Sequence, residues 1–259
     1  MLSETTEEMA VERIGEATHV VFKRGARGNA LSAGLVETLL EAVRTAATDG
    51  SRLLTFRGIG ANFCTGFDLA DLQSQEESDL VLRFIRIEQL LQELHHASVE
   101  TTAFAHGRVF GAGADLFCAC DRRVAAPGTT FRFPGIRFGV VLGTRRLAHR
   151  VGADAAQDIL FAGRELTTEA AERAGMVTKV VPQSDWPQFE TDALAAAAAI
   201  DADASRLARA RLRPDTREGD MFALVASVSE PGLKQRMIDY RDSTRPARAA
   251  PIAARNPGT

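Results

Sequence analysis

Cysteine is scarce in this chain, and long apolar runs are missing from it. Among 259 residues there are three cysteines, Cys64, Cys118 and Cys120. No histidine or second cysteine pair stands at metal-ligand spacing, so we expect buried, reduced thiols and no metal site. No apolar run reaches the roughly 20 residues that cross a bilayer, and the acidic residues 1–15 lack the apolar segment of a secretory signal. These absences predict a cytoplasmic protein with no membrane partner.

A large charge of one sign is also lacking. The formal net charge is −3, and no basic tract is long enough to suggest a nucleic-acid partner. Apolar residues make up 45% of the chain and charged residues 25%. These fractions are ordinary for a soluble globular protein, and a chain of this length can bury a sizeable core.

Strand-like and helix-like patterns alternate along the first half of the chain. β-Branched and aromatic content predicts strands over residues 18–23, 52–56 and 99–105. Apolar residues at helical spacing predict helices over 32–48, which Ser32 can cap, and over 79–95. After Gly143 the segments 144–163, 167–175, 186–200, 203–212 and 217–240 have helical patterns, with one strand over 177–181. The alternation favours an α/β fold with crossover connections.

Two glycine-centred turns, over residues 61–69 and 106–116, are the candidates for chemistry, and each follows a predicted strand. Glycine lets the backbone turn tightly and approach a ligand closely. The second turn opens a predicted helix, whose first amides have no partner within the helix and carry the positive end of its dipole. Such amides are suitable donors to a developing oxyanion. Either turn taken alone could equally be a tight loop without a function.

Taken together and in order, these segments resemble the crotonase family, the enoyl-CoA hydratase/isomerase superfamily. The matching residues are Gly28-Asn29-Ala30-Leu31, Phe63 to Leu69, Gly107 to Asp121, Phe133-Pro134, Gly139, Arg146-Leu147, Val151-Gly152, Gly163-Arg164, Ala170-Ala171, Gly175 and Val177 to Val181. The likeness covers residues 10–185 well and the remaining helices loosely.

The resemblance implies a crotonase-like α/β fold, in which a spiral of ββα units forms two nearly perpendicular sheets beside a helical C-terminal region. It implies a core over residues 1–195, a helical trimerisation region over 196–243, and assembly into homotrimers or hexamers. Residues 244–259 are rich in Arg, Pro and Ala with little to bury, so we expect a mobile tail there.

The resemblance also implies an acyl-CoA substrate, with coenzyme A as part of the substrate and no separate cofactor. By position, the backbone amides of Phe67 and Ala112 correspond to the family's oxyanion hole. Phe67 departs from the small residue usual there, although only in its side chain. The residues that match the coenzyme A and substrate-binding stretches are Ala26, Arg27, Gly28, Thr65, Gly66, Asp68, Leu69 and Gly111.

The family's hydratases use two glutamates, and this chain differs at both positions. The first falls on Asp115, whose stem is shorter, and the second on Gly135, which can transfer no proton. One carboxylate that moves a proton between the α and γ carbons suffices for double-bond isomerisation, whereas concerted addition of water is harder without a second group. We therefore expect isomerase-like chemistry with Asp115 as the single acid/base. The helix start favours its ionised form; the alternative is that Asp115 only stabilises the helix dipole.

Several other polar residues have weaker assignments. His106 stands where the family commonly has asparagine; it could titrate near neutral pH, but a strand-end histidine bound to backbone groups is favoured. Arg132 and Arg137 flank Gly135 and could bind an anion, or could be solvated surface. Thr144 could cap the helix that follows it. Lys234 and Arg241 are candidates for binding phosphate groups.

Other classes of protein fit less well. The glycines at 107, 111 and 113 match the spacing in short-chain dehydrogenases, but they lie too far along the chain, and the only tyrosine, Tyr240, has no lysine four residues later. The G-x-S-x-G motif of serine hydrolases is missing. The remaining alternative is a catalytically silent crotonase fold that binds acyl-CoA or a protein partner, which the loss at Gly135 suggests.

Overall fold

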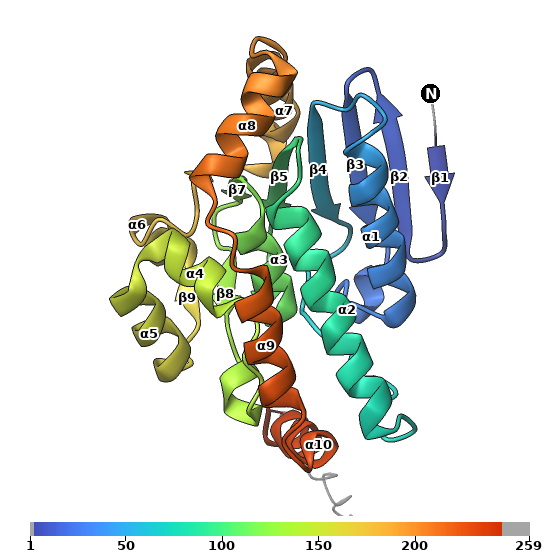
Figure 1. Ribbon diagram of the computed structural model, residues 1–259, viewed down its shortest axis with the longest axis vertical. Helices are drawn as coiled ribbons and strands as arrows, with labels where there is room; N and C mark the ends of the chain where they lie inside the picture. Colours follow the sequence, from blue (N-terminus) through green and yellow to red (C-terminus); the bar gives the residue numbers. More distant parts are fainter. Residues whose placement is uncertain (1–2, 245–259) are drawn as a thin grey trace, which may run out of the picture.

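The computed structural model describes residues 3–244, which form a mixed α/β fold with two sheets (Figure 1). The larger sheet has seven strands in the order β1-β2-β3-β4-β5-β7-β10. They are β1 (Ser3–Thr5), β2 (Met9–Ile14), β3 (Ala17–Phe22), β4 (Leu53–Gly58), β5 (Glu100–Ala105), β7 (Arg122–Ala125) and β10 (Lys179–Val180). The β1-β2-β3 pairs are antiparallel, and all pairs from β3 onward are parallel. The predicted alternation of strands and crossover helices is confirmed.

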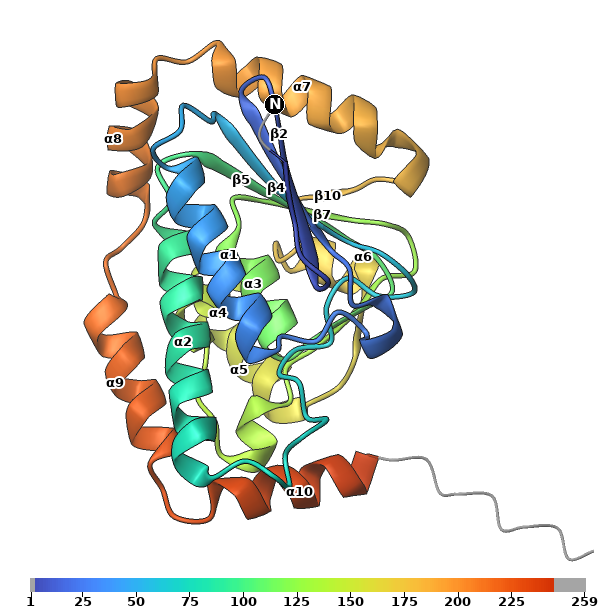
Figure 2. The same ribbon diagram turned by 90° about the vertical axis from the view of Figure 1, so that its right-hand side faces the viewer.

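The crossover helices pack on one face of this sheet and a later helix packs on the other (Figure 2). The first face carries α1 (Ala33–Ala46), α2 (Glu77–His95) and α3 (Ala112–Ala119); α7 (Trp186–Ala198) lies on the second. Strand β5 shows the division, because Ala103 and Ala105 join the main core while Phe104 packs with Trp186. Ser32 caps α1 as predicted, since its hydroxyl accepts the N–H of Leu35 at 3.0 Å.

The smaller sheet brings the two glycine-centred turns together. Its strands are β6 (Arg108–Phe110), β8 (Thr130–Arg132) and β9 (Leu166–Thr167), in the order β6-β8-β9. Cys64, in the first turn, forms a parallel bridge with Val109 of β6, and the Phe110 N–H donates to the Cys64 carbonyl at 3.0 Å. Because β6 leads directly into α3, the first turn lies beside the start of that helix.

Glycine interrupts two of the predicted C-terminal helices. The segment 144–163 divides at Gly152 into α4 (Thr144–Val151) and α5 (Ala153–Ala162), and 217–240 divides around Pro231-Gly232 into α9 (Arg217–Val228) and α10 (Leu233–Thr244). Both glycines have positive φ, 85° and 81°, which side chains rarely adopt. The predicted helical character of both segments is confirmed, and each glycine divides its segment into two helices. Figure 2 shows the result for α10, which crosses beneath the end of α2.

The remaining helices are short or peripheral. They are α6 (Thr168–Arg173), α8 (Ala202–Leu212) and the 3-10 turns Gly25–Arg27, Gly135–Phe138 and Gln183–Asp185. Ion pairs join α8 and the residue that follows it to the segment between α3 and β7, because Arg209 and Arg213 both bind the carboxylate of Asp121. Helices α8, α9 and α10 occupy the region predicted over 196–243, whose role in trimerisation stays a prediction. Of the predicted tail over 244–259, residues 245–259 lie outside the described residues.

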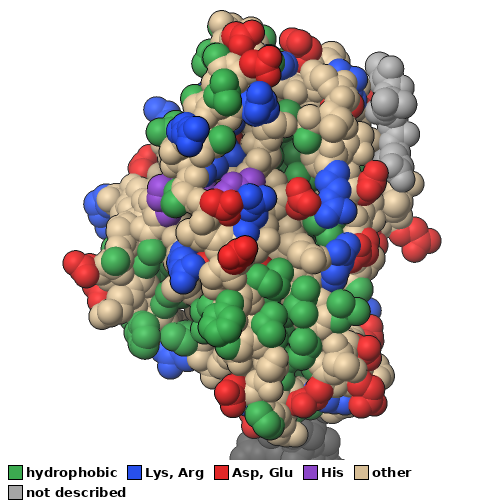
Figure 3. All heavy atoms as spheres, viewed as in Figure 1, with side chains coloured by type: hydrophobic (Ala, Val, Ile, Leu, Met, Phe, Trp, Pro, Cys, Tyr) green, Lys and Arg blue, Asp and Glu red, His purple; other side chains and the backbone are tan. Residues whose placement is uncertain are grey.

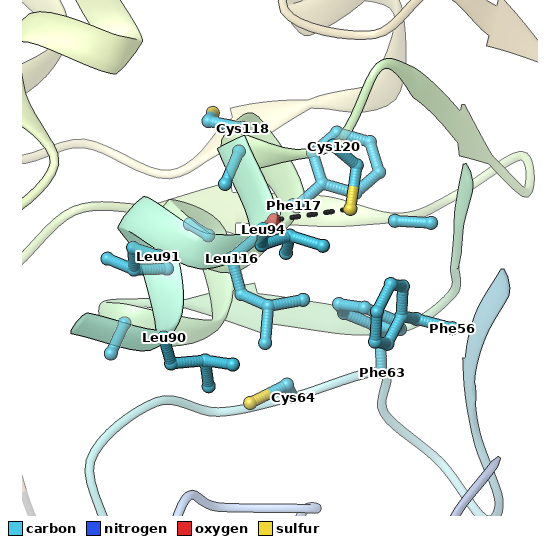
Figure 4. Packing of buried hydrophobic residues seen from close by; sticks show 14 of the residues in the cluster. Phe56, Phe63, Cys64, Leu90, Leu91, Leu94, Leu116, Phe117, Cys118 and Cys120 are labelled. Atoms are coloured by element: carbon cyan, nitrogen blue, oxygen red, sulfur yellow. Dashed lines mark hydrogen bonds between the residues drawn. The ribbon is translucent and has the colours of Figure 1, made fainter. Parts of the chain in front are cut away.

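The three cysteines are buried and free, as predicted. Figure 4 shows Cys118 and Cys120 at the end of α3, and Cys64 among the side chains of the main core. Burial raises the pKa of the Cys64 and Cys118 thiols to about 12 each, which keeps them protonated and unreactive. Within residues 3–244, no group of His, Cys, Asp or Glu is placed to hold a metal, and no helix is long and apolar enough to cross a membrane.

Candidate functional site

A cavity of about 330 Å³ lies where the two glycine-centred turns meet the C-terminal helices. Six predicted site residues line it: Thr65, Phe67, Leu69, Gly111, Ala112 and Asp115. The rest of the wall is mainly apolar and aromatic: Phe84, Phe110, Phe133, Pro134, Gly135, Ile136, Phe138, Val140, Val141, Leu142, Thr144, Leu160, Phe161 and Tyr240. An apolar wall with a few convergent polar groups is typical of a small-molecule site.

The peptide group before Phe67 has its orientation fixed from one side. The Gly66 carbonyl accepts the N–H of Leu31 at 2.7 Å, and the Asp68 N–H donates to the Leu31 carbonyl at 3.2 Å. In a planar trans peptide the carbonyl and the next N–H point in opposite directions. The Phe67 N–H therefore points away from Leu31, and it donates to no group within residues 3–244.

The amide of Ala112 opens α3 and is likewise without an acceptor among the described residues. Gly111, with φ of 53°, is the N-cap of this helix. Gly66 packs directly against the same segment, because a Cβ on Gly66 would lie 2.6 Å from the Phe110 carbonyl oxygen and 3.1 Å from the Ala112 nitrogen. Only glycine permits this approach, which brings the Phe67 and Ala112 amides to the same end of the cavity.

Among the described residues that line the cavity, Asp115 is the only one with a carboxylate, and it is 6% exposed. Burial raises its pKa well above the usual value; Arg146 lowers the pKa and Glu88 raises it. The expectation that the helix start favours the ionised form was therefore wrong, because removal from water outweighs the favourable dipole. Its carboxyl group also lies against Gly143, where a Cβ would be 2.1 Å from Oδ1.

A buried ion-pair network lies behind Asp115. Arg146 of α4 donates to Glu88 of α2 at 3.0 Å through Nη1 and also through Nη2, and to Asp220 of α9 at 3.2 Å. The side chains of Arg146 and Glu88 are 3% and 1% exposed. Arg146 lowers the pKa of Asp115 and Glu88 raises it, so the two effects oppose each other. The network therefore offsets little of the rise in pKa that burial causes.

The predicted coenzyme A residues outside the cavity lie next to it or on the surface. Ala26 and Arg27 are exposed. Gly28 lies beside Thr65, whose N–H donates to the Gly28 carbonyl at 3.0 Å. Asp68 pairs with Arg24 at 2.6 Å. None of these four residues lines the cavity itself, and their role in binding coenzyme A stays a prediction.

The weaker candidates are already engaged in other contacts. The Nε2 atom of His106 lies 2.9 Å from the Gly60 carbonyl oxygen, so the favoured backbone-bound arrangement is confirmed. Arg132 and Arg137 bind carbonyls at the end of α5. Lys234 Nζ donates to two backbone carbonyls, and Arg241 binds Asp242. Thr144 does not cap α4, because Gly143 is the N-cap and Thr144 lies within the helix.

Sequence reasoning missed most of the cavity wall. Phe84, Phe138, Phe161 and Tyr240 come from four separate segments, and no local pattern connects them. Phe138 and Tyr240 have ring centres 5.1 Å apart, which joins α10 to the cavity wall. Arg83 was also missed: its guanidinium carbon lies 3.8 Å from the centre of the Phe67 ring. The unusual phenylalanine at position 67 was the only available signal for that contact.

Comparisons with known proteins agree with this architecture. A family model for enoyl-CoA hydratase/isomerase matches residues 15–219. A probable enoyl-CoA hydratase of Mycobacterium tuberculosis is 32% identical over 170 residues, which cover 64% of this chain and 68% of the relative. A solved structure from Bordetella parapertussis, provisionally named an enoyl-CoA hydratase/isomerase, is 43% identical with a TM-score of 0.89 and covers 92% of this chain and 99% of its own.

A more distant solved structure extends the likeness of the fold alone. The enoyl-CoA hydratase of Bacillus halodurans is 21% identical with a TM-score of 0.80, over 90% of this chain and 99% of its own. The family model matches most of the chain, and the relatives match in both sequence and fold. The chain belongs to the crotonase superfamily, as a member of the enoyl-CoA hydratase/isomerase family.

Proposed function

We propose that this enzyme binds an acyl-CoA thioester, stabilises its enolate with the N–H groups of Phe67 and Ala112, and uses Asp115 as its single acid/base. Coenzyme A enters only as part of the substrate. The observation that carries the proposal is the composition of the cavity wall. Asp115 is the one carboxylate that the described residues contribute to it, and Gly135, at the position of the second family glutamate, lines the same cavity without a side chain.

Isomerisation of a 3-enoyl thioester fits these residues. The Asp115 carboxylate takes a proton from the α carbon, and the electron pair of the C–H bond delocalises into a dienolate with charge on the thioester oxygen. Two amides that point at this oxygen stabilise it, each by about 3–4 kcal/mol. The Asp115 carboxyl then returns its proton to the γ carbon, which gives the 2-enoyl thioester and restores the carboxylate.

The raised pKa of Asp115 supports this role. A carboxylate with a pKa nearer neutrality is a stronger base toward a C–H bond and a usable acid in the return step. Addition of water would need a second group to position and deprotonate the water molecule, and the part of the cavity wall formed by residues 3–244 has no further carboxylate or histidine. Isomerase-like chemistry is therefore preferred over efficient hydration.

Deuterium exchange tests the proposal. The protein is incubated in heavy water with 3-enoyl-CoA thioesters of several chain lengths, and label and product are followed by mass spectrometry. We expect incorporation by the wild-type protein and a fall of about 10²- to 10⁴-fold in Asp115→Asn, the range for loss of a general base. The wild-type rate should rise with pH through the raised pKa of Asp115, because only the ionised carboxylate takes the proton.

Asp154→Asn is the matched control, because Asp154 is an exposed carboxylate in the first turn of α5. Its loss changes helix stability by about 0.3–1 kcal/mol and should leave exchange unchanged. If Asp115→Asn and Asp154→Asn exchange deuterium at the same rate, Asp115 only stabilises its helix and is not an acid/base. Binding of thioesters with no exchange by the wild-type protein would favour the catalytically silent alternative.

We also propose that the chain assembles into the trimers implied by its family. Four large apolar side chains in the region 196–243 are between 54% and 76% exposed: Ile200, Leu207, Leu212 and Phe222. Figure 3 shows apolar side chains gathered on the lower half of one face, where α9 and α2 lie in Figure 1. Exposed apolar side chains gathered in this way mark an interaction surface.

A further inference from the structure

Phe67 is a large residue at a position where the family usually has a small one, and its ring is held from two directions. The ring of Phe84 stacks on it with centres 4.6 Å apart and planes inclined by 25°. The guanidinium carbon of Arg83 lies 3.8 Å from the centre of the same ring. Both distances are those of direct stacking, so α2 restrains the Phe67 side chain through two consecutive residues.

Arg83 also binds the backbone on either side of the site segment. Its Nη2 donates to the Leu31 carbonyl at 3.2 Å and to the Asp68 carbonyl at 3.1 Å, while Nη1 donates to Gln75 at 2.8 Å. Leu31 makes the backbone hydrogen bonds that orient the peptide group before Phe67, and Asp68 is the residue directly after Phe67. One planar cation therefore contacts the ring of Phe67 and both backbone segments that orient its amide.

We propose that Arg83 is a positioning residue that aims the Phe67 N–H at the thioester oxygen. The inference rests on the proposed function, since it assigns a role to that amide. Arg83 does not line the cavity and acts through Phe67 and its neighbours. A guanidinium suits this position because it is planar and forked, so it can stack on a ring and donate to two carbonyls together. A lysine ammonium has neither property.

The test measures carbonyl polarisation as well as rate. The probe is butyryl-CoA labelled with ¹³C at the thioester carbonyl, whose NMR signal moves downfield when hydrogen bonds polarise it. Exchange of its α protons in heavy water gives kcat and KM. In Arg83→Met we expect a smaller downfield shift and a fall in kcat of about 10- to 100-fold, the scale for a misplaced catalytic group. KM should change by less than about threefold, because positioning acts on the transition state.

Two further variants separate positioning from charge and from folding. Arg83→Lys keeps the charge and should resemble Arg83→Met in both readouts. Arg86→Met removes a cation from the same helix that pairs with exposed Glu37, and it should behave as the wild-type protein. Retention of the full carbonyl shift and kcat by either Arg83 variant overturns the positioning role.

Failure of the proposed function gives a different result. A wild-type protein that binds the probe without shifting its carbonyl signal would remove the oxyanion assignment, and the role of Arg83 with it. If the wild-type protein shifts the carbonyl signal and the Arg83 variants shift it equally, the oxyanion assignment stands and only the role of Arg83 is refuted.

Discussion

At the scale of single residues, the site depends on contacts between segments far apart in the chain. The sequence predicts Asp115 at a helix start, and α3 begins at Ala112 as expected. The raised pKa of Asp115 could not be predicted from that position, because it results from burial by residues such as Gly143 and from the nearby Arg146–Glu88 pair. A local sequence pattern indicates that a helix dipole acts on the carboxylate, but it does not indicate how much water reaches that carboxylate.

Substitution of Gly143 should disturb Asp115 directly. A Cβ at this position would lie 2.1 Å from Oδ1 of Asp115, and the φ of 66° is unfavourable for any side chain. We expect Gly143→Ala to lower α-proton exchange by about 100-fold, as for a catalytic group displaced by 1 Å. The backbone strain should also lower the free energy of unfolding by about 1–3 kcal/mol.

Gly128→Ala separates strain from displacement. Gly128 has a similar φ of 78°, and a Cβ there would meet nothing within 4 Å. In urea unfolding the two variants should lose comparable stability, while only Gly143→Ala loses exchange. Loss of exchange in both would attribute the effect to general destabilisation.

At the scale of helices and strands, periodic patterns predicted most of the long elements. The helices over 32–48 and 79–95 and the strands over 18–23, 52–56 and 99–105 are confirmed within a few residues. The strands β6, β8 and β9 were not predicted, because they have only two or three residues each and are defined by pairing with distant segments. These short strands hold the second turn against the first, so the geometry of the site could not be predicted either.

The Arg146 network connects three helices that lie far apart in the sequence. Arg146→Met would leave the carboxylate of Glu88 buried without its cation, while Asp220 would keep its longer contact with the exposed Arg145 at 3.6 Å. We expect the free energy of unfolding, measured by urea titration, to fall by about 3–5 kcal/mol. Loss of the cation should also raise the pKa of Asp115 further and move the pH–rate profile for exchange to higher pH.

The exposed pair Arg44–Glu93 provides the comparison, since its side chains are 50% and 43% exposed. Arg44→Met should change stability by no more than about 1 kcal/mol and leave the pH–rate profile in place. A similar small effect for Arg146→Met would show that the buried network contributes little.

At the scale of the whole molecule, several separated motifs in the correct order identified the crotonase fold, although none of them is decisive alone. The described chain has the expected sheets and helical C-terminal region, and its relatives share them. The placement of α10 was not predicted, because it depends on packing of Leu233 and Met237 with residues from α2 and α9. The spacing of apolar residues within α10 does not indicate that this helix packs against the cavity.

The exposed apolar surface gives the prediction for assembly. Phe222→Asp places a charge on the most exposed large apolar side chain of the described residues. If this surface joins subunits, the substitution should weaken the trimer by about 30-fold or more, as for a central interface residue. Light scattering after size-exclusion chromatography measures the shift toward smaller species. Ile14→Asp charges another exposed large apolar side chain, at the end of β2, and should leave the assembly intact. A monomeric wild-type protein would contradict the prediction.

The position of Tyr240 in the cavity wall has a consequence for how the site forms during synthesis. Asp115, both glycine-centred turns and the sheets that support them leave the ribosome well before α10 does, since α10 begins at Leu233. Until α10 docks, the part of the cavity wall that Tyr240 supplies is missing, and the cavity that Asp115 lines is more open to water. The nascent protein therefore has its reactive groups early but acquires the dry environment that tunes them only after α10 has been synthesised.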